Sequence, residues 1–177
     1  IVLNGEDISD SKIETRISKG LAIVPEGRRI FPDLTIRENL MVGGHVVATN
    51  IMSEGIDMVY EYFPRLSERR DQAAGSLSGG EQQMLAMGRA LISRPKILIV
   101  DELSLGLMPK VVDECYAVLA KLKTENIGVV LVEQNTERAF AVADDVVVLE
   151  AGNEIWSGSA EEARGNDALR ASLMGLH

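Results

Sequence analysis

The chain has 177 residues, of which 46% are hydrophobic and 25% are charged, and it carries a formal net charge of −9 at pH 7. This length and composition suit one globular domain with a substantial core. The acidic balance argues against a nucleic-acid partner, since such surfaces normally carry a basic patch. No apolar run of the sequence approaches the about 18 to 20 residues that span a bilayer, so we expect any membrane role to be peripheral.

The first part of the chain is predicted to form a short strand and turn over residues 1–8, then a core strand over residues 21–24 that Pro25 stops. Residues 35–75 are predicted to be mostly helical. The apolar positions that recur there at helical spacing, and that are expected to pack, are Ile56, Val59, Tyr60 and Phe63.

Residues 77–83 read Leu-Ser-Gly-Gly-Glu-Gln-Gln. Ser78 and Glu81 have the spacing of a capping box, which begins a helix, and Gly79 and Gly80 leave bare backbone amides at that helix start. A helix start of this kind attracts phosphate. Most capping boxes merely begin helices, so the motif is a weak signal by itself.

Residues 97–102 are an apolar run that ends in two acids. The run predicts a buried parallel strand that brings Asp101 and Glu102 to the carboxyl edge of a sheet, where nucleotides bind in open α/β folds. One carboxylate would hold Mg²⁺ and the other would orient water. Together with residues 77–83, this segment indicates half of an ATPase site.

Helices and strands alternate through the rest of the chain, which predicts a parallel sheet with covered faces. The single cysteine, Cys115, lies on the apolar face of a predicted helix and is expected to be a buried structural thiol. The predicted elements are an amphipathic helix over 111–122, strands over 129–132 and 146–149, a helix over 136–142, a turn at 151–153 and a C-terminal helix that Ser159 caps.

The order of residues 77–83, a helix containing Gly-Arg-Ala-Leu at 88–91 and the strand ending in Asp-Glu resembles the signature and Walker B segments of ATP-binding cassette (ABC) ATPases. The resemblance covers essentially the whole chain. It implies an α/β fold, with a RecA-like P-loop NTPase core and an α-helical ABC subdomain. Residues 1–177 would form a single, partial ABC ATPase domain, with core portions at 1–34 and 96–177 and the helical subdomain at about 35–95.

A P-loop has the form Gly-x-x-x-x-Gly-Lys-Ser/Thr, and no stretch of this chain matches it. The chain begins at Ile1, in a segment that looks like the strand following the P-loop helix in ABC ATPases. We therefore expect an N-terminally truncated sequence, which would be inactive alone. The alternative is a natural binding protein that has no P-loop.

The resemblance implies that the site is shared between two subunits. Ser78, Gly79 and Gly80, with Glu81 in the same motif, would bind the γ-phosphate of ATP held by the P-loop of a second subunit. Asp101 would be a Mg²⁺ ligand. Glu102 would polarise the attacking water.

Three positions depart from the commonest ABC pattern. Glu26 replaces the Q-loop glutamine and is expected on the metal side of the site. Gln134 replaces the switch histidine, so it would serve catalysis by donating a hydrogen bond and would not carry a proton. Leu103 stands where proline commonly follows the two acids.

Four stretches resemble the ATP-binding subunit of bacterial and archaeal importers for branched-chain amino acids. They are residues 24–40, 60–70, 77–91 and 131–135. The importer reading implies ATP and Mg²⁺, a second related ATPase subunit, membrane permeases and, indirectly, a substrate-binding protein. It implies a cytoplasmic subunit, peripheral on the inner face of the cell membrane, on which Tyr62 is expected to face a permease.

Three alternatives stay open at this point. The first is the ATPase of a urea or amide importer. The second is a soluble, non-transport ABC ATPase, and the third is a degenerate interaction module that binds no nucleotide.

Overall fold

The computed structural model describes residues 1–173. After Val132 the chain divides into two compact units, and each is described by itself. None of the helices in the described part of the chain is both long enough and apolar enough to cross a membrane.

The first unit is built on a parallel sheet in the order β3-β4-β5. Val24 of β3 lies opposite Val100 of β4, and Asp101 lies opposite Val132 of β5, so the three strands end at one edge. A short antiparallel hairpin and one helix precede the sheet. The bounds are β1 Val2–Leu3, β2 Glu6–Asp7, α1 Ile13–Ser18, β3 Leu21–Val24, β4 Ile97–Asp101 and β5 Gly128–Val132.

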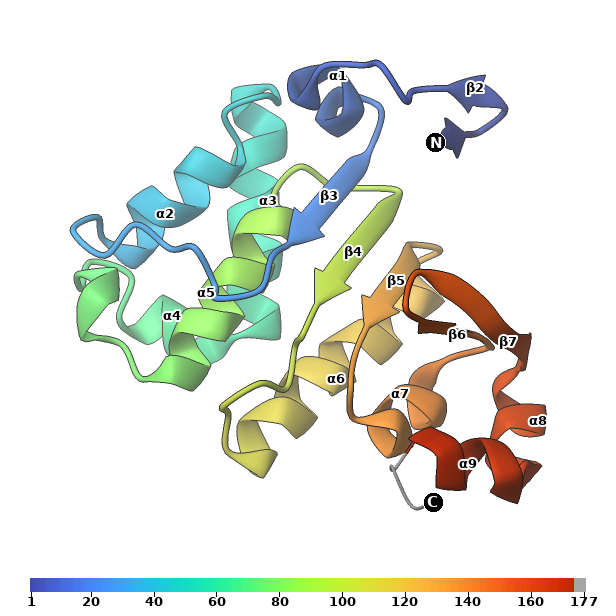
Figure 1. Cartoon of the computed structure of the whole chain (residues 1–177). Coiled ribbons are helices and arrows are strands. Elements are labelled where there is room, and N and C mark those ends of the chain that lie inside the picture. Colours follow the sequence, from blue (N-terminus) through green and yellow to red (C-terminus); the bar gives the residue numbers. More distant parts are fainter. Residues whose placement is uncertain (174–177) are drawn as a thin grey trace. The chain divides into compact units, whose positions relative to one another are not determined.

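Helices α2 to α5 lie together beside β3 (Figure 1). They are tightly packed: a Cβ atom at Gly43 would lie 2.3 Å from the carbonyl oxygen of Arg89, so only glycine allows this crossing of α2 and α5. The helices of this unit are α2 Ile36–Gly43, α3 Thr49–Tyr62, α4 Pro64–Glu68, the 3₁₀ turn Ala74–Ser76, α5 Gly79–Leu91 and α6 Pro109–Thr124.

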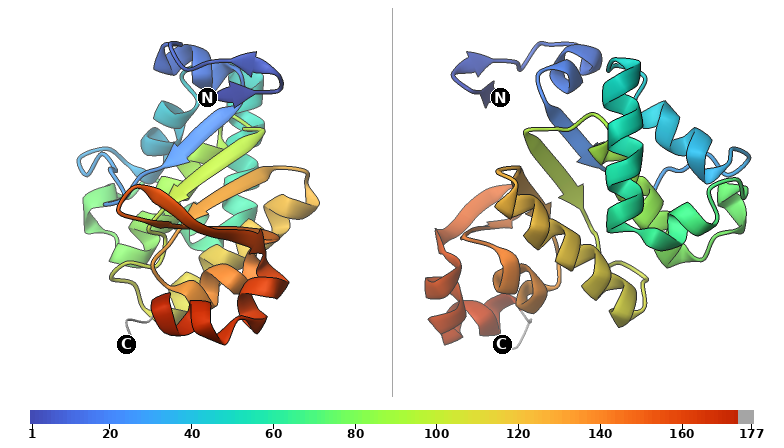
Figure 2. Two further views of the ribbon diagram at one scale, coloured as in Figure 1. Left: turned by 45° about the vertical axis from the view of Figure 1, so that its right-hand side comes forward. Right: turned by 180° about the vertical axis from the view of Figure 1, so that it is seen from behind.

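The parallel sheet is covered on one face only within this unit. Leu98 and Val100 are fully buried. Helix α6 packs on β5, as the right-hand view of Figure 2 shows. On the other face Ile23, Val130 and Val132 are 57%, 51% and 49% exposed. Strands of a parallel sheet are normally buried on both faces, so this apolar face lacks the cover that such sheets usually have.

The second unit is an antiparallel hairpin packed on three helices. Its core holds Phe140, Val148, Ala163 and Leu169, with Trp156 packed against them. The bounds are α7 Thr136–Val142, β6 Asp145–Glu150, β7 Asn153–Ser159, α8 Ala160–Gly165 and α9 Asp167–Leu173.

The hairpin differs from the parallel pairing expected of the predicted strands. Ala151 and Gly152 have φ values of +47° and +80°, and two successive positive φ angles form the tight turn that joins antiparallel neighbours. The turn itself and the capping box at Ser159 were predicted. The box is confirmed, since the Ser159 amide donates to Glu162 Oε2 at 2.9 Å and the Glu162 amide donates to Ser159 Oγ at 3.2 Å.

Several sequence-based predictions for the first unit are confirmed. β3 covers residues 21–24 as predicted. Of the four predicted packing residues, Val59 and Phe63 are buried, whereas Ile56 and Tyr60 are half-buried. Cys115 is fully buried on α6, and this burial, followed by the charge of Glu114, raises the pKa of its thiol to about 12. Cys115 is therefore a core residue, as expected.

Candidate functional site

The start of α5 is built by the predicted capping box. The amide of Ser78 donates to Glu81 Oε2 at 2.9 Å, and the Ser78 hydroxyl donates to the same oxygen at 2.8 Å. The amide of Glu81 completes the box by donating to Ser78 Oγ at 3.4 Å. Gly79 and Gly80 are the first two residues of the helix, so their amides have no acceptor within it. These N–H groups point outward from the N-terminal end of the helix.

Glu81 holds this motif together. Its side chain is buried, and its second oxygen, Oε1, accepts a hydrogen bond from Arg69 Nη1 at 2.8 Å. Burial raises the pKa of Glu81, but the Ser78 hydroxyl and amide and the charges of Arg69 and Arg65 outweigh it, so the pKa lies below its ordinary value. Because both carboxylate oxygens are engaged within the chain, we assign Glu81 to positioning Ser78 rather than to contacting a nucleotide.

The two glycines of the motif have different neighbours. A Cβ atom at Gly80 would lie 2.6 Å from Cγ1 of Val111, at the start of α6. A Cβ atom at Gly79 would lie 3.1 Å from both Nη atoms of Arg28. Sequence reasoning assigned neither contact, because each joins segments that lie far apart in the chain.

Glu26, Asp101 and Glu102 leave the sheet at the same edge. β3 and β4 are parallel with Val24 opposite Val100, and each carboxylate follows within two residues of that pair. Glu26 is exposed, whereas Asp101 and Glu102 are half-buried. The predicted placement of Asp101 and Glu102 at the carboxyl edge of the sheet is thus confirmed.

Glu102 has a left-handed backbone, with φ of +52°. Its amide donates to the carbonyl of Val132 at 2.9 Å, and the next residue, Leu103, is fully buried. A non-glycine residue with this φ is strained and persists only where its surroundings hold it. Leu103 is thus a core residue at the position where the sequence lacks the common proline.

Gln134 belongs to the second unit, where it is exposed and lies two residues after β5 ends. The next residue, Asn135, caps α7, since its Oδ1 accepts from the amide of Arg138 at 3.2 Å. Gln134 therefore sits in the segment between a strand end and a helix start.

The family model for ABC transporters matches residues 1–104. The chain belongs to the ABC transporter family. It is 43% identical, over 97% of its length and 73% of the relative, to "High-affinity branched-chain amino acid transport ATP-binding protein BraG" of Pseudomonas aeruginosa. It is 33% identical, over 99% of its length and 75% of the relative, to "Probable branched-chain amino acid transport ATP-binding protein LivF" of Archaeoglobus fulgidus.

The fold is likewise that of an ABC ATPase. A nucleotide-free ATP-binding cassette from an ABC transporter superposes with a TM-score of 0.83, at 22% identity, over 98% of this chain and 74% of that structure. This likeness confirms the predicted α/β class with its RecA-like core.

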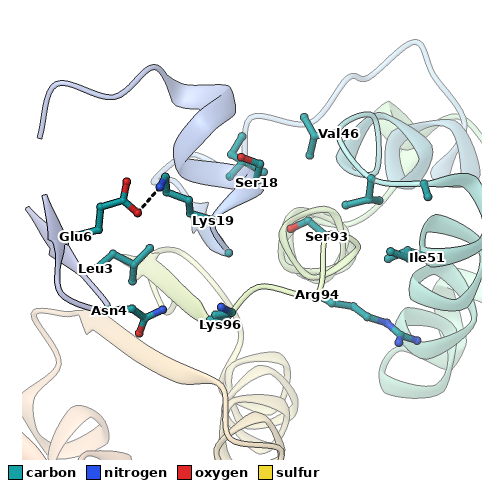
Figure 3. Close-up of a pocket in the computed structure, with 14 residues that line it drawn as sticks. Leu3, Asn4, Glu6, Ser18, Lys19, Val46, Ile51, Ser93, Arg94 and Lys96 are labelled. Atoms are coloured by element: carbon teal, nitrogen blue, oxygen red, sulfur yellow. Dashed lines mark hydrogen bonds and ion pairs between the residues drawn. The ribbon is translucent and has the colours of Figure 1, made fainter. Parts of the chain in front are cut away.

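A hollow of this chain lies away from Asp101 and Glu102. It measures about 520 Å³ and is bordered by Gly20 and Lys96, which precede β3 and β4 at the amino ends of those strands. Figure 3 shows Lys19 paired with Glu6 at its rim. Nucleotides bind outside the carboxyl ends of such strands, so this hollow is not the ATP site.

Tyr62, the residue expected to face a permease, is engaged within the chain. Its hydroxyl donates to Glu125 Oε2 at 2.7 Å, and the Lys121 ammonium lies 4.4 Å from its ring centre. Burial, followed by the hydrogen bond to Glu125, raises the pKa of Tyr62. Tyr62 therefore ties α3 to α6, and its docking role stays a prediction.

Proposed function

We propose that this chain is an ATP-binding and ATP-hydrolysing subunit of an ABC importer for branched-chain amino acids. The observation that carries the proposal is 43% identity, over 97% of the chain, to a relative named for that transport. A second relative with such a name is 33% identical. The urea or amide importer ATPase remains the alternative that shares most of these features.

We propose that Asp101, together with Glu26, holds Mg²⁺ beside the nucleotide. The donor set suits this ion, since Mg²⁺ binds through one or two carboxylates and the phosphates of its substrate. Among residues 1–173 no group of three or more His, Cys, Asp or Glu side chains surrounds a possible metal position, so the proposed site depends on these two carboxylates and the phosphates of the nucleotide. When bound, the ion neutralises charge on the phosphates.

Glu102 is proposed to orient the attacking water. Its carboxylate accepts a hydrogen bond from that water, and its strained backbone fixes the direction in which the side chain leaves the strand end. Gln134 is proposed to donate from its amide to the γ-phosphate. It does not ionise, so it stabilises charge without moving a proton.

The signature residues Ser78, Gly79 and Gly80 are proposed to bind the γ-phosphate of ATP held by a second, related subunit. The bare amides at the start of α5 supply donors for that phosphate. Closure of the two subunits around ATP would move membrane permeases, which receive amino acids from a substrate-binding protein. The chain would then work in the cytoplasm, on the inner face of the membrane.

We propose that residues 1–34 and 96–177 belong to the RecA-like core and residues 35–95 to the helical subdomain. The open apolar face with Ile23, Val130 and Val132 is the surface on which a P-loop segment would pack. A P-loop placed there lies on the same sheet as Asp101 and Glu102.

The test joins the P-loop segment of the Pseudomonas relative ahead of Ile1. This extended chain should hydrolyse ATP with a dependence on Mg²⁺, and Glu102→Gln should abolish turnover because it removes the charge that orients water. Activity that survives Glu102→Gln contradicts the proposed role. Uptake of radiolabelled leucine in cells lacking the relative then tests the cargo, and the extended chain is expected to restore it. Failure to restore leucine uptake, with restored urea uptake in cells that lack a urea importer ATPase, contradicts the cargo assignment.

A further inference from the structure

Arg28 lies against the signature motif. Its Nη1 and Nη2 atoms each lie 3.1 Å from the position that a Cβ atom at Gly79 would take, and Nη1 is 3.4 Å from Gln82 Oε1. Within the described residues 1–173, this long hydrogen bond to a neutral amide is the sole polar contact of the Arg28 guanidinium. The absence of a Cβ at Gly79 is what gives the guanidinium room.

The loop that carries Arg28 is fixed to the helices rather than to the sheet. Arg89 of α5 donates to the carbonyl of Arg29 at 2.5 Å, and its guanidinium lies 4.7 Å from the ring centre of Phe31. The buried side chain of Asn39 on α2 accepts from the amide of Phe31 and donates to its carbonyl, both at 2.9 Å. The loop that carries Arg28 is therefore held by the same group of helices that presents Gly79.

The charge of Arg28 is unbalanced in this position. The N-terminal end of a helix carries partial positive charge, so a second positive group beside it is unfavourable unless an anion joins them. The nearest carboxylate of the motif, Glu81, already accepts hydrogen bonds from Ser78 and Arg69. An anion that enters at Gly79 would meet the helix amides and the guanidinium together.

We propose that Arg28 is a phosphate-binding residue that acts with Ser78, Gly79 and Gly80 on the terminal phosphate of the nucleotide held by the second subunit. The inference rests on the proposed function of the signature. It adds a charged donor to a motif that otherwise offers a hydroxyl and backbone amides, and charge-assisted hydrogen bonds are about twice as strong as neutral ones.

The proposal gives neighbouring residues of one loop to two different nucleotides. Glu26 follows β3 at the edge that carries Asp101, so it serves the nucleotide of its own subunit. Arg28, two residues later, faces Gly79 and serves the nucleotide of the other subunit. Gly27, with φ of +76°, is the point at which the chain turns from one to the other.

The experiment uses the 177-residue chain at low ionic strength, with sodium tripolyphosphate as the probe and the amide resonances of Gly79 and Gly80 as the readout. In the parent chain these resonances and the Nε–H of Arg28 should shift in a saturable way. Arg28→Gln should raise the dissociation constant about tenfold, and Arg28→Lys, which keeps the charge, should raise it less.

Arg29→Gln is the matched control. Arg29 lies in the same loop and also has a left-handed backbone, with φ of +48° beside +65° at Arg28. Its side chain is exposed, and it contacts α5 through its backbone carbonyl. It should bind the probe as the parent does. If Arg28→Gln binds as tightly as the parent, the inference is overturned and the proposed function stands; if Gly79 and Gly80 of the parent do not respond, the proposed role of the signature fails.

Discussion

Gly80→Ala tests whether the second glycine of the signature is required by packing. The new Cβ would lie 2.6 Å and 2.8 Å from the two Cγ atoms of Val111, whereas carbon atoms pack at about 3.5 to 4.0 Å. Val111 is buried on α6, and its β-branched side chain has one favoured rotamer in a helix. The start of α5 must therefore move from α6 by about 1 Å.

The expected loss follows from two opposing terms. Overpacking a filled site costs about 1 to 3 kcal/mol, and replacing glycine by alanine in a helix returns up to about 1 kcal/mol. We expect Gly80→Ala to lower the free energy of unfolding by about 1 to 2 kcal/mol. Gly79→Ala is the matched control, because its Cβ meets only the flexible end of Arg28, and it should leave stability unchanged or slightly raised.

Urea unfolding followed by far-ultraviolet circular dichroism is the assay, because the single tryptophan, Trp156, lies in the second unit and does not report on α5. A Gly79→Ala chain that loses as much stability as Gly80→Ala would refute the argument. So would a Gly80→Ala chain as stable as the parent.

Three further outcomes are expected. Glu81→Gln should lower the free energy of unfolding by about 1 to 2 kcal/mol at neutral pH, since it removes the negative charge to which Ser78 and Arg69 donate, although glutamine keeps an oxygen that can accept from Ser78. Because the folded pKa of Glu81 lies below its ordinary value of 4.5, the parent should lose this advantage as the pH falls below that value. Urea titrations between pH 7 and pH 3 measure the loss. Cys115 should react with a thiol reagent at pH 8 only as fast as the chain unfolds, because burial raises its pKa to about 12; rapid native-state labelling would contradict its burial. In the P-loop-extended chain, Gln134→Ala should slow ATP turnover without abolishing it. The pH–rate profiles of parent and variant should show the same ionisations, because glutamine does not titrate. Full activity of the variant would exclude Gln134 from the site.

Local signals in the sequence were sufficient for the elements of the site. The capping box at Ser78 and the strand ending in Asp101 were predicted because each depends on residues that are neighbours in the chain. The parallel pairing of β3 and β4 followed from the alternation of strands and helices, and it placed Glu102 at the correct edge.

Contacts between distant segments were beyond such reasoning. The glycine at position 80 was explained by its bare amide alone, whereas the structure adds the approach of Val111. Tyr62 was expected to be available to a partner because it lies off the apolar face of its helix, but Lys121 of α6 and Glu125, which follows that helix, reach it. Neither pairing leaves a periodic pattern in the sequence.

The signature of this chain is proposed to close over ATP bound by another subunit. The most direct measurement is size-exclusion chromatography with light scattering of the P-loop-extended chain carrying Glu102→Gln, with and without ATP. ATP should convert the monomer to a dimer, because nucleotide binds but is not hydrolysed, and adding Ser78→Arg should abolish the dimer by filling the phosphate position with a bulky side chain. A double variant that still dimerises on ATP would contradict the account.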